Sequence, residues 1–364
     1  MLRYVILCCL FPGTLFSQEH VGETSYWDGQ YYYGAMLRHN KNVAHLVTNQ
    51  PQGFILSYNR KTFGEKYWQR AYNYPDWGAS FIYQDFNGVS LDRNFGLYGH
   101  YNFYFLKRNL QFRLGQGIAY TTDPFDIDSN FKNTAYGSSF MASTYMMINF
   151  QKQDIVQGLG LQAGLVFVHH SNGSFKAPNT GTNVVALNAG VTYNFSSDTP
   201  VEYVEDSIEE DFSEKVTYNF LIRGGVNEGD IIGLGQHPFW VLTAFADKRL
   251  NYKSTLQFGV EAFFSKFLEK EIEYRALAFN SSTLNGDEDY KRVGVFVGHE
   301  FRMGTIAIPA QVGYYLYWPY EYEIRVYSRV GVKHYFTNKW FGVATVKTHG
   351  ANAEAIEFGI GIRL

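Results

Sequence analysis

Cysteine is almost missing from this sequence of 364 residues, and proline is scarce. The two cysteines, Cys8 and Cys9, are adjacent and lie close to the N-terminus. The remainder of the chain therefore has no disulfide, no reactive thiol and no cysteine-based metal site. It also lacks a glycine-rich phosphate loop and a histidine-rich metal motif, so we predict neither a metal nor a cofactor.

Long apolar runs are missing beyond the N-terminal segment. No later stretch approaches the roughly 18 consecutive apolar residues that a membrane-spanning helix requires, which excludes a helical membrane protein. The formal net charge is -3 at pH 7, which argues against a nucleic-acid partner.

The N-terminal segment has the features of a secretory signal peptide. Met1 and a single basic residue, Arg3, precede an apolar run over 4–16, and Ser17-Gln18 follows it. This order predicts a signal peptide over 1–17, cut near Ser17, and an exported chain over 18–364.

Aromatic residues and glycine are abundant instead: the chain has 29 Tyr, 31 Phe and 35 Gly, with a mean hydropathy of -0.24. Apolar and polar residues alternate in many segments, as in 95–105, where Phe95, Leu97, Tyr101 and Phe103 fall on one face. Alternation over about ten residues is typical of strands that cross a membrane as a β-barrel, because one face meets lipid and the other meets the lumen.

About sixteen such segments can be counted, an even number that fits a bacterial barrel. The longer connections mostly follow odd-numbered segments, so these should run toward the outside of the cell. We predict one barrel of about sixteen strands over 18–364, with an acidic loop or linker at 196–214. The closing segment, 356–364, resembles a single C-terminal assembly signal, which favours this over the alternative of two eight-stranded barrels. The segments lie near 31–40, 53–60, 77–86, 95–106, 109–121, 138–150, 158–171, 183–195, 215–226, 239–249, 254–265, 291–302, 305–317, 323–336, 339–348 and 354–364.

Three polar residues share the lipid-facing parity of the seventh and eighth segments. His169 and Ser171 continue the face of Leu165 and Phe167, about 6–7 Å apart along the strand. Asn183 has the outward parity of the following segment. A polar group on a lipid-facing wall needs a functional reason, and these three converge beside one loop.

The combination of hydroxyl, imidazole and carboxamide suits ester hydrolysis. Ser171 could act as nucleophile, His169 as general base, and Asn183 as the group that orients the imidazole. Asn172 and Gly173 directly follow the nucleophile, where they could form an oxyanion hole. Since the seventh segment should end at the outer leaflet, the expected partner is an outer-leaflet lipid.

The run from His169 to Asn183 resembles the active-site segment of the PagL family of lipid A 3-O-deacylases, and of longer homologues called acyloxyacyl hydrolases. The shared elements are His-x-Ser-Asn, beginning at His169, and Lys-x-Pro-Asn-x-Gly, beginning at Lys176. For the longer homologues the resemblance extends over the chain. It implies a serine esterase of the bacterial outer membrane that removes an ester-linked acyl chain from lipid A.

Two departures from the smaller deacylases bear on this expectation. They have Glu where this chain has Asn183, and they are about half as long. The His-Ser-Asn set also resembles outer membrane phospholipase A, a calcium-dependent enzyme, so that phospholipid is an alternative substrate. A non-catalytic barrel that serves as a pore or scaffold is a third alternative. The oligomeric state is not predicted.

Overall fold

The computed structural model describes the chain except for residues 1–24, 196–201, 206–211, 213 and 280–283. The predicted signal peptide over 1–17 lies outside the described residues. Within the described residues, no helix is long and apolar enough to span a membrane.

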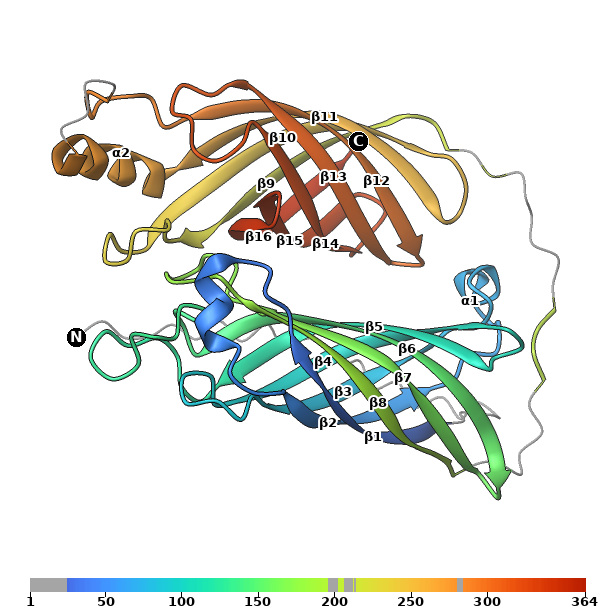
Figure 1. Ribbon diagram of the computed structural model, residues 1–364. Helices are drawn as coiled ribbons and strands as arrows, with labels where there is room; N and C mark the ends of the chain where they lie inside the picture. The colour runs from blue at the N-terminus through green and yellow to red at the C-terminus, as the bar shows by residue number, and fades with distance from the viewer. Residues whose placement is uncertain (1–24, 196–201, 206–211, 213, 280–283) are drawn as a thin grey trace, which may run out of the picture.

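The described strands form two closed antiparallel barrels, each of eight strands in sequential order (Figure 1). We call them the first and the second barrel. Within the described ranges, three helical segments lie in connections: η1 (Lys41–Leu46), α1 (Tyr67–Ala71) and α2 (Lys266–Phe279). The first barrel consists of β1 (Ser25–Met36), β2 (Gln52–Arg60), β3 (Asp76–Asp85), β4 (Arg93–Phe105), β5 (Leu110–Thr121), β6 (Phe140–Val156), β7 (Leu159–Ser171) and β8 (Thr182–Asn194). The second consists of β9 (Thr217–Asn227), β10 (His237–Arg249), β11 (Ser254–Ser265), β12 (Arg292–Met303), β13 (Ile306–Tyr317), β14 (Val326–Tyr335), β15 (Trp340–His349) and β16 (Asn352–Arg363).

The prediction of one sixteen-stranded barrel is therefore wrong, and the alternative of two eight-stranded barrels fits. β1 pairs with β8 from Tyr26↔Asn194 to Met36↔Val184, and β16 pairs with β9. Each pairing satisfies the backbone groups of two strands that would otherwise be open edges. Alternation could not reveal this closure, because period two reports which face a residue occupies and not which strand lies alongside.

The first barrel has outward aromatic residues at the end of β8. Tyr193 and Phe195 follow the outward parity of Val191, and their rings contact each other with centroids 4.8 Å apart. The connection to β9 begins directly after them. The predicted acidic linker at 196–214 falls in this connection, and most of it lies outside the described residues.

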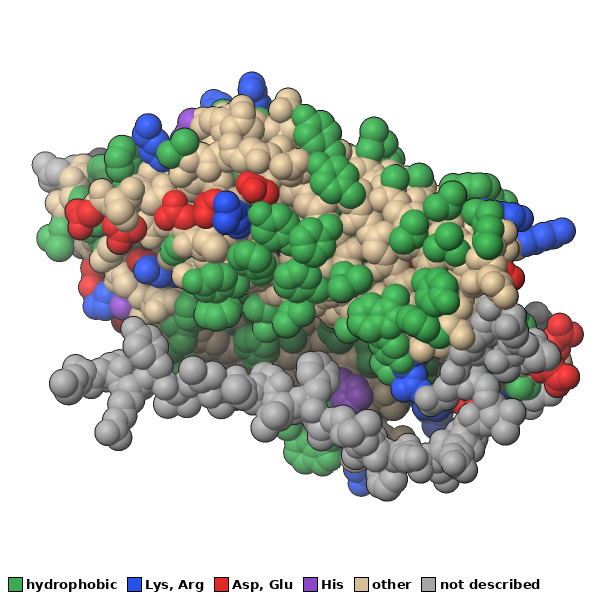
Figure 2. All heavy atoms as spheres, turned by 90° about the horizontal axis from the view of Figure 1, so that it is seen from below, with side chains coloured by type: hydrophobic (Ala, Val, Ile, Leu, Met, Phe, Trp, Pro, Cys, Tyr) green, Lys and Arg blue, Asp and Glu red, His purple; other side chains and the backbone are tan. Residues whose placement is uncertain are grey.

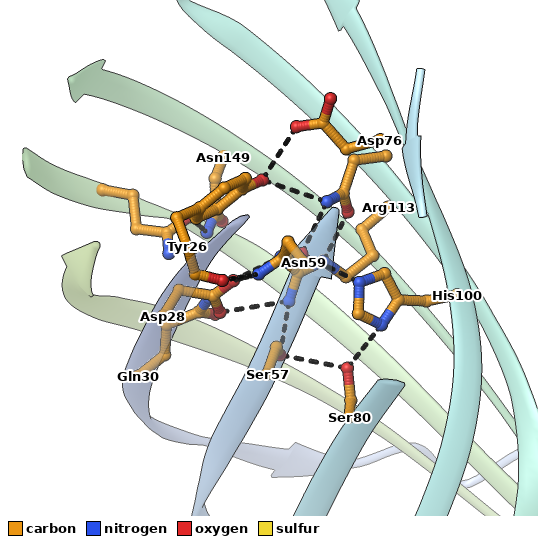
Figure 3. Close-up of polar contacts among 12 residues, drawn as sticks. Tyr26, Asp28, Gln30, Ser57, Asn59, Asp76, Ser80, His100, Arg113 and Asn149 are labelled. Atoms are coloured by element: carbon orange, nitrogen blue, oxygen red, sulfur yellow. Dashed lines mark hydrogen bonds and ion pairs between the residues drawn. The ribbon is translucent and has the colours of Figure 1, made fainter. Parts of the chain in front are cut away.

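Side chains fill the lumen of the first barrel, as Figure 3 shows around Arg113. The Arg113 and Asp28 side chains are both 0% exposed, and their closest N–O distance is 2.6 Å. The Arg113 Nε atom also donates to Asn102 Oδ1 at 2.6 Å. Eight-stranded barrels have interiors just wide enough for side chains, and paired, hydrogen-bonded charges satisfy one another there. This packing argues against the pore alternative for the first barrel.

The outer wall of the first barrel carries apolar side chains. On β2, Phe54 and Leu56 are 46% and 45% exposed, whereas the intervening Ile55 and Ser57 are buried. Figure 2 shows hydrophobic side chains gathered over the middle of one face of the molecule. An apolar outer band of this kind suits a lipid environment.

Candidate active site

The pairing of β7 with β8 brings His169 and Asn183 together. The two residues are direct register partners, and both side chains are half-buried on the outer wall, between neighbours that point inward. His169 Nδ1 and Asn183 Oδ1 are 2.6 Å apart. Because the amide oxygen can only accept, Nδ1 carries the proton in this contact and Nε2 is left as the basic nitrogen.

Ser171 lies on the same outer wall, two residues beyond His169. Its hydroxyl donates to Asn179 Oδ1 at 3.0 Å and accepts from the Gly173 N–H at 3.0 Å. The structure gives no hydrogen bond between Ser171 and His169, although it places both side chains on one side of the wall. A serine hydroxyl rotates between partners, and catalytic hydrogen bonds often form only when substrate is bound.

Gly181 lies next to the side chains of both His169 and Ser171. A Cβ atom added to Gly181 would lie 3.4 Å from Ser171 Cβ, 3.6 Å from His169 Cε1 and 2.8 Å from the His170 carbonyl oxygen. Gly181 also has φ +65°, which disfavours residues with a side chain. A glycine here keeps open the space beside both groups.

Asn179 is a site residue to which the sequence reasoning gave no role. Its Oδ1 atom accepts from both the Ser171 hydroxyl and the Asn172 N–H, at 3.0 and 2.8 Å. It is the Asn of the Lys-x-Pro-Asn element, so the motif was the signal that could have identified it.

The two predicted oxyanion-hole residues have different surroundings. The backbone N–H of Asn172 donates to Asn179 Oδ1. The side-chain amide of Asn172 donates to the Lys176 carbonyl oxygen at 2.6 Å. The Gly173 N–H instead points at the Ser171 oxygen, on a backbone with φ +61°. The Gly173 N–H therefore lies beside the hydroxyl of the predicted nucleophile, whereas the Asn172 N–H is occupied by Asn179.

Among the residues that the structure describes, no three His, Cys, Asp or Glu side chains gather as they would around a metal ion. The predicted site residues all come from β7, β8 and the loop that joins them. The arrangement offers a hydroxyl, an oriented imidazole and a backbone donor, which are the kinds of group that serine-dependent acyl transfer uses.

Two family descriptions match the sequence, one for each barrel. Residues 52–192 match the lipid A 3-O-deacylase (PagL) family. Residues 216–364 match the C-terminal domain of the acyloxyacyl hydrolases. No match is found among curated protein sequences.

Solved structures of outer-membrane barrels share only low similarity. Neisserial surface protein A is 12% identical with a TM-score of 0.29, over 47% of this chain and 97% of that protein. A mutant porin from Rh. blastica is 11% identical with a TM-score of 0.20, over 93% and 99%. Omp33 from Acinetobacter baumannii is 8% identical with a TM-score of 0.19, over 94% and 98%. Likenesses at this level say nothing about function.

Proposed function

Because the chain belongs to the PagL family of lipid A 3-O-deacylases and carries the acyloxyacyl hydrolase C-terminal domain, we propose that it is a serine esterase that removes an ester-linked acyl chain from lipid A. Membership of this family makes it a hydrolase of the bacterial outer membrane. The serine mechanism and the individual residue roles are our proposal.

The observation that carries the proposal is the 2.6 Å contact between His169 and Asn183 on the wall that also holds Ser171. A histidine with one nitrogen fixed by a hydrogen bond and the other free is the arrangement that a general base requires. The neighbouring outward residues are apolar: Leu165 is 52% exposed and Leu187 is 71% exposed. Acyl chains of a lipid substrate can therefore lie against the same wall as the reacting groups.

The reaction would proceed in two stages. In the first, His169 Nε2 takes the hydroxyl proton while the Ser171 oxygen attacks the ester carbonyl carbon. The Gly173 N–H donates to the oxyanion that forms. The intermediate then collapses, the acyl chain stays on Ser171, and the sugar oxygen leaves with the proton from His169.

In the second stage a water molecule takes the place of the sugar. His169 removes one proton from the water, the resulting hydroxide attacks the acyl-serine carbonyl, and Ser171 leaves with the proton returned by His169. The products are a fatty acid and lipid A with one free hydroxyl. Asn183 holds the ring throughout but supplies no negative charge to stabilise imidazolium, unlike a carboxylate in that position.

The test is product analysis with the purified protein in vesicles that contain lipid A and phospholipid. We expect the wild-type protein to release fatty acid from lipid A, and Ser171→Ala to release none above background. Ser129→Ala, at a serine in the β5–β6 loop that bonds only to Asp126 among its described contacts, is the matched control and should retain full activity.

Three results would contradict the proposal. Activity in Ser171→Ala rules out the serine mechanism. Fatty acid released only from phospholipid, and only with calcium, favours the phospholipase alternative. No release by the wild-type protein favours a scaffold.

A further inference from the structure

The loop that follows Ser171 is bound on its far side by the second barrel. Among the residues that the structure describes, four hydrogen bonds join the loop to this barrel, all at residues 174–177. The Ser174 carbonyl accepts from the Glu228 N–H at 2.9 Å, and the Ser174 hydroxyl donates to the Ala353 carbonyl at 2.5 Å. The Phe175 carbonyl accepts from Gln236 Nε2 at 2.7 Å. The Ala177 N–H donates to Glu228 Oε2 at 2.9 Å.

Glu228 makes two of these bonds and also bridges the barrels through its carboxylate. While Oε2 accepts from Ala177, Oε1 accepts from the Gly235 N–H at 3.1 Å. Glu228 follows the end of β9 and is only 6% exposed. Burying a carboxylate is costly, and bonds from oriented backbone N–H groups offset that cost only while both donors stay in position. Glu228 therefore couples the positions of the two loops.

The contact extends to Gly173, the proposed oxyanion donor. A Cβ atom added to Gly173 would collide with the side chain of Ile356, which lies on β16 of the second barrel. The Gly173 N–H donates to the Ser171 oxygen at 3.0 Å. Gly173 is buried and thus lies next to both the proposed nucleophile and a side chain of the second barrel.

We infer that the second barrel holds the oxyanion-hole segment 172–177 in its active conformation, and that Glu228 is the main positioning residue. This inference rests on the proposed function of Ser171 and Gly173. A donor stabilises an oxyanion strongly only if its direction is fixed before the reaction, and a surface loop without support samples other directions. Glu228 acts through the loop and does not touch the reacting atoms.

The test compares Glu228→Ala with a matched control in the full-length protein, in vesicles of lipid A and phospholipid. Loss of one preorganised oxyanion donor lowers kcat by about 100- to 1000-fold. We expect the indirect effect of Glu228→Ala to be smaller, about 10- to 100-fold in kcat with little change in KM. Glu288→Ala is the control, because the Glu288 carboxylate also accepts from two backbone N–H groups, of Asn285 and Gly286, in another loop of the second barrel. It should behave as wild type.

A second readout separates loop positioning from stability and from lipid binding. A fluorophosphonate probe labels an activated serine at a rate that depends on the oxyanion hole, and heat-dependent gel migration reports whether the barrels are assembled. We expect Glu228→Ala to remain assembled and to be labelled at Ser171 at least ten times more slowly. Glu228→Gln, which keeps one acceptor oxygen, should recover part of the rate.

Wild-type labelling and turnover in assembled Glu228→Ala overturn the inference and leave the proposed function intact. Should Glu228→Ala fail to assemble, Gln236→Ala repeats the comparison, since this exposed side chain also donates to the loop. Wild-type rates in assembled Gln236→Ala then overturn the inference. Failure of the proposed function looks different: either Ser171→Ala is as active as the wild type, or the wild-type protein itself releases no fatty acid from lipid A.

Discussion

Replacing Asn183 tests the orientation of His169 most sharply. The Nδ1–Oδ1 contact of 2.6 Å is the one hydrogen bond that the described structure gives to the imidazole. Asn183→Leu removes the acceptor and keeps a side chain of similar size. A hydrogen bond of this kind contributes about 1–3 kcal/mol, since its loss also leaves a half-buried N–H without a partner. With about 1.4 kcal/mol per factor of ten, we expect kcat to fall roughly 5- to 150-fold.

Asn183→Asp is the complementary change. An aspartate keeps the oxygen that accepts from Nδ1 and adds a negative charge, which stabilises the imidazolium that forms when His169 takes the serine proton. We therefore expect Asn183→Asp to equal or exceed the wild-type kcat. The assay is fatty-acid release from lipid A in vesicles under saturating substrate, with gel migration as the assembly control.

Asn109→Leu is the matched control, in the β4–β5 turn at the opposite end of the first barrel, where Asn109 donates to the Leu106 carbonyl at 2.9 Å. It should not change kcat. Wild-type kcat in an assembled Asn183→Leu protein would refute the assignment of Asn183 as the orienting residue. The same holds if Asn183→Asp loses as much activity as Asn183→Leu.

Four further outcomes are expected. Asn179→Ala should lower kcat about tenfold in the same vesicle assay without raising KM, because the Ser171 hydroxyl and the Asn172 N–H lose their common acceptor. An unchanged kcat would exclude a role of Asn179 in positioning Ser171. Gly181→Val should abolish activity in an assembled barrel, since its Cβ would lie 2.8 Å from the His170 carbonyl oxygen, and an active Gly181→Val protein would contradict the described loop. Arg113→Ala should lower the free energy of unfolding in urea by about 3–5 kcal/mol, because it leaves a buried carboxylate unpaired. Arg93→Ala removes an exposed arginine that pairs with Asp92 and should cost less than about 1 kcal/mol; equal effects would contradict the packed lumen. Excess EDTA should leave the rate of lipid A hydrolysis unchanged. If EDTA inhibits hydrolysis and added calcium restores it, the phospholipase alternative is favoured.

The strands and the faces that they turn to lipid could be predicted from the sequence, but the closure of these strands into two barrels could not. Alternation in segments such as 95–105 indicates which side chains face lipid, because each strand must cover one apolar and one polar environment. The pairing of β1 with β8 depends on which strand ends meet in space. No pattern within a strand encodes that choice, and the weight given to the closing segment 356–364 led to the wrong number of barrels.

In the candidate site, the residues on strands could likewise be predicted from the sequence, whereas those in the loop could not be predicted from periodicity. His169, Ser171 and Asn183 were selected because they share the parity of apolar residues on regular strands, and strand geometry then brings His169 opposite Asn183. Their catalytic roles stay predictions. Asn179 and Gly181 lie in a loop, where side-chain direction follows no period, so only the family motif pointed to them.

The contacts from Glu228 and Ile356 could not be foreseen at all. They join residues about fifty and more than one hundred and eighty positions apart along the chain, through the packing of one barrel against the other. Residue patterns describe single strands and helices, whereas these contacts depend on how two complete barrels are placed next to each other.

The most direct measurement is mass spectrometry of lipid A extracted from cells that produce either the wild-type protein or Ser171→Ala in equal, assembled amounts. Wild-type cells should contain lipid A lighter by one ester-linked acyl chain, and cells with Ser171→Ala should retain the complete lipid. Identical lipid A in both, whether complete or deacylated, would contradict a serine esterase at Ser171.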